Sequence, residues 1–145
     1  MKKDKMPLDT TFLKRCIESL EGSFTRLGQA KKDDILYDIF RAATIKEFEI
    51  ILEQSGKLLR KCLGPYFHSP KEVAQMTFKD VFRHSGRHGL ISLKEVERWL
   101  EYRDNRNLTS HDYGFKLAEQ TLRLIPSFIK DAQRLVSVIE SAHDS

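Results

Sequence analysis

The sequence is poor in the residues that break or link secondary structure. Its 145 residues include only 7 glycines and 4 prolines, and no low-complexity segment or linker interrupts them. No stretch alternates apolar and polar residues for long enough to predict a β-strand. No apolar run approaches the roughly 20 residues that a membrane-spanning helix needs, and the first five residues lead into no signal-peptide core. These absences predict a single helical domain, residues 1–145 with a core at about 9–142, and no membrane association.

Several common chemical signatures are also missing. The two cysteines, Cys16 and Cys62, lie far apart without metal-ligand spacing, so neither a disulfide framework nor a zinc site is indicated, and a cytoplasmic location is expected. The chain has no P-loop, GxGxxG, HExxH or GxSxG pattern, which argues against the commonest nucleotide-binding and hydrolase classes. We therefore expect no cofactor and no metal. The net charge of +4 permits nucleic-acid binding without arguing for it.

Apolar residues recur every three or four positions, which predicts helices. A first helix begins behind Asp9 or Thr10, and a longer second helix runs from near Asp33 to a stop at Leu63-Gly64-Pro65. A helix start is predicted at Ser69–Glu72, where Pro70 takes the first helical position.

The second half of the chain follows the same pattern. Another Ser-x-x-Glu helix start lies at Ser92–Glu95, and residues 85–89 before it are expected to form a loop. The last helix runs from about Phe115 to Ile139 and is expected to bend at Pro126. The sequence thus predicts an all-α fold, an up-and-down four-helix bundle with an additional short helix. Five aromatic residues at helical spacing are expected in its core: Phe78, Phe82, Trp99, Phe115 and Phe128.

The histidines are the main candidates for acid–base chemistry. His84 and His88 have the four-residue spacing that can bind a metal on a helix, but Gly86 lies between them and no carboxylate or cysteine completes a ligand set. A pair of loop histidines is the better interpretation.

Residues 102–113 form an unusually polar segment before the last apolar helix. If the fourth helix continues through it, Arg103, Asn107 and His111 share one face. Arg106 and His111 are about 140° apart on an ideal helix, so they would meet through a bend or across a two-fold axis. Such a pair offers a cation for phosphate oxygens and an imidazole for proton transfer. The spacing alone is weak, because Arg83 and His88 share it, and from the residues alone a solvated charged face is the better interpretation of the segment.

Part of this polar segment, with several segments elsewhere in the chain, resembles a known family. Residues 106–113, Arg-Asn-Leu-Thr-Ser-His-Asp-Tyr, resemble the R-x4-H-x-Y signature of the HEPN superfamily, in the branch of HepT-like toxins and nucleotidyltransferase substrate-binding proteins. Similar segments are found at four further places, residues 46–49, 69–73, 89–91 and 99–100. The resemblance covers roughly Ile35 to Ile139.

The resemblance implies a homodimeric helical bundle whose two motif copies face a shared cleft. It implies a metal-independent ribonuclease toxin that cleaves RNA and pairs with a small nucleotidyltransferase antitoxin. Arg106 and His111 are then catalytic, and Asn107 supports them. Tyr113 corresponds to the tyrosine that the partner adenylylates to silence the toxin.

Some assignments stay open at this point. Ser110 and Arg103 are expected to support the catalytic pair from neighbouring positions. The alternative function is a non-catalytic nucleotidyltransferase substrate-binding subunit, although such a scaffold has no need of an intact Arg106–His111 pair. Residues 82–88 are more basic and richer in histidine than the family pattern, which either extends an RNA-binding rim or has no role.

Overall fold

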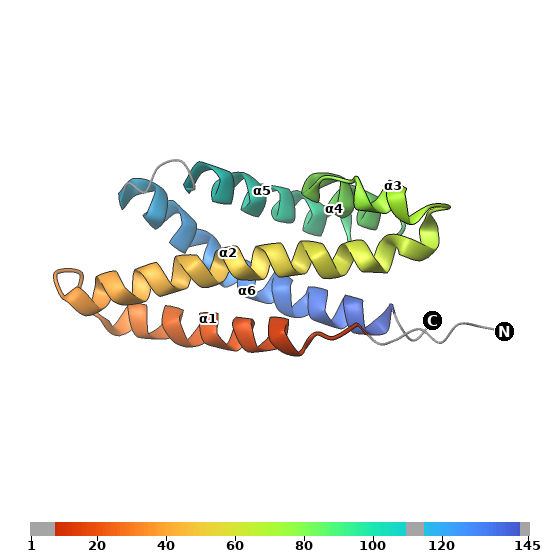
Figure 1. Ribbon diagram of the computed structural model, residues 1–145. Helices are drawn as coiled ribbons and strands as arrows, with labels where there is room; N and C mark the ends of the chain where they lie inside the picture. The colour runs from red at the N-terminus through yellow and green to blue at the C-terminus, as the bar shows by residue number, and fades with distance from the viewer. Residues whose placement is uncertain (1–7, 110–114, 143–145) are drawn as a thin grey trace.

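The computed structural model describes residues 8–109 and 115–142, which form six α-helices and one 3-10 helix without any strand (Figure 1). The elements in chain order are α1 (Thr11–Gln29), α2 (Ile35–Leu63), η1 (Gly64–Tyr66), α3 (Pro70–Ala74), α4 (Phe78–Arg87), α5 (Leu93–Thr109) and α6 (Phe115–Ser141). The all-α class is confirmed. None of these helices is long and apolar enough to cross a membrane.

The long helices pack around a shared core. Helix α1 packs against α2 and α6, and α2 also contacts α4, while α5 lies between α4 and α6. Figure 1 shows α1, α2 and α6 side by side, with α3, α4 and α5 together on the other side of α2. The end of α5 and the start of α6 therefore lie at one end of the bundle, and the loop between α4 and α5 lies toward the other.

Helix starts lie at or close to the predicted positions. Asp34 caps α2 by accepting a hydrogen bond from the backbone N–H of Leu36 at 2.9 Å. Ser92 and Glu95 form the predicted reciprocal capping box at the start of α5, with bonds of 2.9 and 3.1 Å. At α1 the Asp9 carboxylate accepts from Thr11 N–H, so Asp9 rather than Thr10 supplies the capping side chain.

The predicted third helix is broken in two. Helix α3 ends at Ala74, and α4 begins after Thr77, which forms a capping box with Asp80 that the sequence analysis did not identify. Ser69 does cap α3, but its hydroxyl accepts from the N–H of Lys71 and closes no box with Glu72. The Arg60 guanidinium donates to two backbone carbonyls at the break, those of residues 73 and 76.

The predicted loop at residues 85–89 is mostly helical, so that prediction is wrong. Residues 85–87 form the last turn of α4, and the chain leaves the helix only at His88 and Gly89, which has a φ of 75°. His84 and His88 are accordingly not a loop pair. His84 lies within α4, and its carbonyl accepts the N–H of His88, the C-cap residue.

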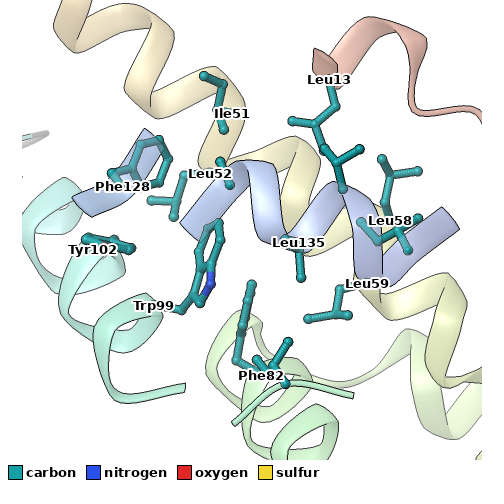
Figure 2. Close-up of a cluster of buried hydrophobic side chains, with 14 of the residues drawn as sticks. Leu13, Ile51, Leu52, Leu58, Leu59, Phe82, Trp99, Tyr102, Phe128 and Leu135 are labelled. Atoms are coloured by element: carbon teal, nitrogen blue, oxygen red, sulfur yellow. The ribbon is translucent and has the colours of Figure 1, made fainter. Parts of the chain in front are cut away.

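An aromatic cluster joins four helices in the core (Figure 2). Each of its members is at most 1% exposed: Phe48 of α2, Phe82 of α4, Trp99 and Tyr102 of α5, and Phe128 of α6. Ring centroids lie 4.6 Å apart for Phe48 and Phe128, and 4.9 Å apart for both Phe82–Trp99 and Tyr102–Phe128. The predicted core positions of Phe82, Trp99 and Phe128 are confirmed, whereas the side chain of Phe115 lies outside the described part of the structure.

A nearly buried carboxylate locks α5 onto α6. Asp131 is 7% exposed at its side chain and receives two bonds of 2.8 Å from the Arg98 guanidinium. The Tyr102 hydroxyl donates a third bond of 2.6 Å. Burial and this carboxylate hold the pKa of Tyr102 well above its ordinary value, so the hydroxyl remains a donor throughout the physiological pH range.

Replacing the buried carboxylate tests how much it stabilises the bundle. We expect Asp131→Asn to lower the free energy of unfolding by about 2 kcal/mol, because bonds to a charged acceptor are lost or weakened while Arg98 and Tyr102 stay in place. The matched control is Asp104→Asn, since Asp104 is 60% exposed in its ion pair with Lys79 and should cost less than about 1 kcal/mol. Urea denaturation of both variants measures the difference, and equal costs would contradict a structural role for Asp131.

The close approach of α2 and α4 requires glycine at position 56. A Cβ there would lie 2.8 Å from a ring carbon of Phe78, so Gly56→Ala must displace the ring and should destabilise the fold by about 1–3 kcal/mol. Gly28→Ala is the control, because nothing lies within 4 Å of a Cβ at that helical position and the change should be neutral or stabilising by up to about 1 kcal/mol. Thermal unfolding of the two variants would refute the packing argument if both shifted the midpoint alike.

Candidate functional site

The predicted motif begins on the last turns of α5. The helix extends through Thr109, so the part of the motif up to that residue is helical. Arg103 and Arg106 are half-buried and Asn107 is exposed. Ser110, His111 and Tyr113 lie outside the described residues, so their placement stays a prediction.

A buried amide anchors the same turns of α5. Asn105 is 9% exposed, and its side-chain oxygen accepts a bond of 2.7 Å from the hydroxyl of Thr121 on α6. Since this contact lies one residue before Arg106, it fixes the backbone that carries the motif arginine. Asn105 faces α6, and the arginines on either side of it face α2.

Arg103 is held by contacts with α2 and α4. Its guanidinium donates to the Glu53 carboxylate at 2.6 Å and lies over the ring of Phe78, with 4.7 Å between the guanidinium carbon and the ring centroid. The side chain is 24% exposed. These contacts give Arg103 a role in positioning α5, and any supporting role in chemistry acts through that position.

Arg106 lines a groove of about 530 Å³ between α2, α5 and α6. The groove is lined by Arg41, Ala42, Ile45, Lys46, Glu49, Arg106 and Ala118. Three cationic side chains thus face one carboxylate, and the remaining lining is apolar and small. A groove with this excess of positive charge favours a phosphate group, which guanidinium groups bind with paired hydrogen bonds.

The α2 side of the groove is held in place by a tyrosine. The Arg41 guanidinium lies 5.7 Å from the ring centroid of Tyr37 and 3.7 Å from the Asp38 carboxylate. The Tyr37 hydroxyl donates to Glu119 of α6 at 2.8 Å. Burial and the Glu119 bond raise the pKa of Tyr37, so this link between α2 and α6 persists at neutral pH.

Sequence reasoning missed most of the groove. Lys46 and Glu49 were noted only as part of residues 46–49, a segment that resembles the HEPN family. Arg41 was not identified at all. The local sequence around Arg41 offers no motif, because its relation to Arg106 arises from packing of α2 against the end of α5. The one available signal was the helical spacing of Ala42, Lys46 and Glu49, which places them on one face of α2.

Comparison with known proteins gives one family match over nearly the whole chain. The family described as nucleotidyltransferase substrate binding protein like matches residues 12–141. The probable ribonuclease HepT of Haemophilus influenzae is 29% identical over 140 residues, which cover 94% of this chain and 93% of that protein.

Two solved structures share the fold. A Haemophilus influenzae protein described as the substrate binding domain of a nucleotidyltransferase superposes with a TM-score of 0.77 at 26% identity, covering 90% of this chain and 98% of its own. A Thermus thermophilus protein superposes with a TM-score of 0.70 at 22% identity, over 88% and 98% of the two chains. The second likeness concerns the fold alone.

Proposed function

This chain belongs to the nucleotidyltransferase substrate binding protein-like family, and we propose that it is a metal-independent ribonuclease of the HEPN type. The observation that carries the proposal is the position of Arg106, the first residue of the R-x4-H-x-Y motif, in a groove with Arg41 and Lys46. A cationic groove that contains the motif arginine suits cleavage of a phosphodiester. The relative named as a probable ribonuclease supports the same reaction.

The proposed reaction uses the substrate's own 2′-hydroxyl as nucleophile. His111 accepts the 2′ proton while the 2′ oxygen forms a bond to phosphorus and the bond to the 5′ oxygen breaks. Arg106 stabilises the negative charge that develops on the phosphoryl oxygens. A second proton donor protonates the departing 5′ oxygen, and in a homodimer His111 of the second copy supplies it. The products are a 2′,3′-cyclic phosphate and a free 5′-hydroxyl.

A small nucleotidyltransferase is the proposed antitoxin partner of this toxin. In the proposed inactivation the Tyr113 oxygen attacks the α-phosphorus of ATP, pyrophosphate leaves, and the tyrosine carries AMP. Because Tyr113 is two residues from His111, the new negative charge would compete with substrate phosphate for the cations beside Arg106. Occlusion by the adenosine would add to the repulsion.

A second candidate function is a non-catalytic subunit that holds substrate for a nucleotidyltransferase. It is favoured by the solved Haemophilus influenzae structure, which is described as such a substrate binding domain. The same groove would then bind phosphate groups without cleaving them. The two candidates differ in whether this protein cleaves RNA, and the ribonuclease proposal requires the Arg106–His111 pair for that cleavage.

Cleavage of total cellular RNA in excess chelator tests the ribonuclease proposal. We expect wild-type protein to leave 2′,3′-cyclic phosphate ends, and Arg106→Ala and His111→Ala each to reduce the rate by about 100-fold or more, since each removes a transition-state interaction. Arg26→Ala, a surface change on α1, is the matched control and should retain full activity. No cleavage, or equal cleavage by all proteins, would favour the binding subunit.

Incubation with ATP and the proposed nucleotidyltransferase partner tests the regulatory step. We expect intact-mass measurement to show addition of AMP to wild-type protein and to the control Tyr66→Phe, but not to Tyr113→Phe, which lacks the acceptor oxygen. Modified protein should lose ribonuclease activity. Labelling of Tyr113→Phe at the wild-type level would place the modification elsewhere and contradict the assignment.

A further inference from the structure

Four aromatic and imidazole rings gather where α4 ends, away from the groove. The rings of Tyr66 and His88 are stacked, with centroids 4.3 Å apart and planes 25° from parallel. The edge of Phe67 meets His84 at 5.1 Å and His88 at 5.9 Å. Tyr66 is 45% exposed and His88 is also exposed, so this ring pair lies at the surface. Phe67 packs against the hydrophobic core, and none of the four side chains lines the groove.

A row of cations runs from this ring pair along α4. Lys79, Arg83 and Arg87 follow one another at four-residue steps and therefore share one helix face. Lys79 pairs with Asp104 at 2.6 Å, and Arg83 lies 3.9 Å from Asp80. Arg87 is exposed, and no ion pair joins it to any residue that the structure describes.

The cation row leads toward the end of α5 that carries Arg106, because α4 and α5 run antiparallel. At the far end a Cβ on Gly86 would lie 2.7 Å from Val96, which places the last turn of α4 against the first turn of α5. At the near end Lys79 reaches Asp104, two residues before Arg106. Arg106 lies ten residues after Val96 on α5, a rise of about 15 Å along the helix.

An exposed ring pair followed by spaced cations matches the chemistry of single-stranded nucleic acid. A base stacks on an aromatic face whatever its identity, and cations spaced along the protein neutralise successive phosphates. Bases within a duplex are already stacked on one another, so the ring pair discriminates in favour of single strands.

We propose that Tyr66 and His88 stack a base of single-stranded RNA while Arg87 and Arg83 bind the adjoining phosphates. This surface holds substrate at a distance from the scissile bond and guides the strand along α4 toward the end of α5 that carries Arg106. That the RNA is a substrate rests on the proposed function. The binding step itself does not, because it can be measured without cleavage.

Binding of a fluorescein-labelled single-stranded RNA of roughly 12 nucleotides tests the proposal. Anisotropy is measured in chelator with full-length His111→Ala protein, so that the probe stays intact. We expect Tyr66→Ala to raise the Kd by roughly 5- to 100-fold, as loss of one stacked base does, and Tyr66→Phe to bind like its parent. Arg87→Ala should weaken binding and lower the slope of log Kd against log salt by about 0.7.

Matched controls show whether a change in Kd is specific to this surface or follows from the loss of any exposed ring or charge. Phe12 of α1 is 55% exposed, so Phe12→Ala removes an exposed ring elsewhere and should leave the Kd unchanged. Arg26→Ala is the corresponding control for charge. The same RNA annealed to its complement should bind nearly equally to the Tyr66→Ala protein and its parent. Thermal unfolding checks each variant, and Arg87→Ala replaces an exposed side chain, so it remains informative if Tyr66→Ala fails to fold.

The outcomes distinguish this inference from the proposed function. Dependence of RNA binding on Tyr66 and Arg87 supports the inference even if wild-type protein cleaves nothing, in which case the ribonuclease proposal alone fails. Kd values within twofold of the parent for both Tyr66→Ala and Arg87→Ala would overturn it. It would also be overturned if these variants bound RNA normally but lost binding to the nucleotidyltransferase, because the rings would then belong to a protein interface.

Discussion

The position of α5 depends on one buried carboxylate. Removing Asp131 from water carries a desolvation cost, and that cost is offset only because Arg98 and Tyr102 supply three short hydrogen bonds. Those bonds leave little freedom in how α5 rotates or slides along α6, since both donors lie on α5 four residues apart. Tyr102 also contributes its ring to the aromatic core. The polar lock and the apolar packing therefore hold the same face of α5, one turn before Arg106.

The groove inherits its geometry from this arrangement. Asn105 binds α6 through Thr121, while Arg103 binds Glu53 on the opposite side. With α5 held from both directions, the backbone that carries Arg106 is fixed beside the groove, and Arg41 on the α2 side contacts Tyr37. Cations fixed before substrate arrives need little reorganisation to stabilise developing charge, which is the advantage that a phosphoryl-transfer site requires. The structural lock and the proposed chemistry are linked through helix placement rather than through shared residues.

Local patterns in the sequence predicted most helices but not the contacts between them. Apolar spacing and the Ser92–Glu95 capping box are local signals, and both were read correctly. The break between α3 and α4 also has a local signal, the capping box of Thr77 and Asp80. It was not identified because the Ser69-Pro70 helix start a few residues earlier indicated one continuous helix. The pairing of Arg98 with Asp131 spans 33 residues and follows from packing alone. The same holds for Arg41 in the groove, whereas Arg106 was identified because the motif is contiguous in sequence.

The modest net charge constrains the proposed binding of RNA. With 25 basic and 21 acidic residues, the net charge of +4 gives only a weak long-range attraction for RNA. Along α4 the row of cations is itself partly neutralised by Asp80 and Asp104. About three phosphate contacts would give a salt slope near −2 for a single strand, which is shallow for a nucleic-acid-binding protein. Affinity must then come from interactions that salt does not screen, and base stacking is the one that an exposed ring pair can provide. In this interpretation stacking on Tyr66 and His88 compensates for the low net charge of the chain. Arg83 and Arg87 then determine which phosphate of the strand is placed for cleavage.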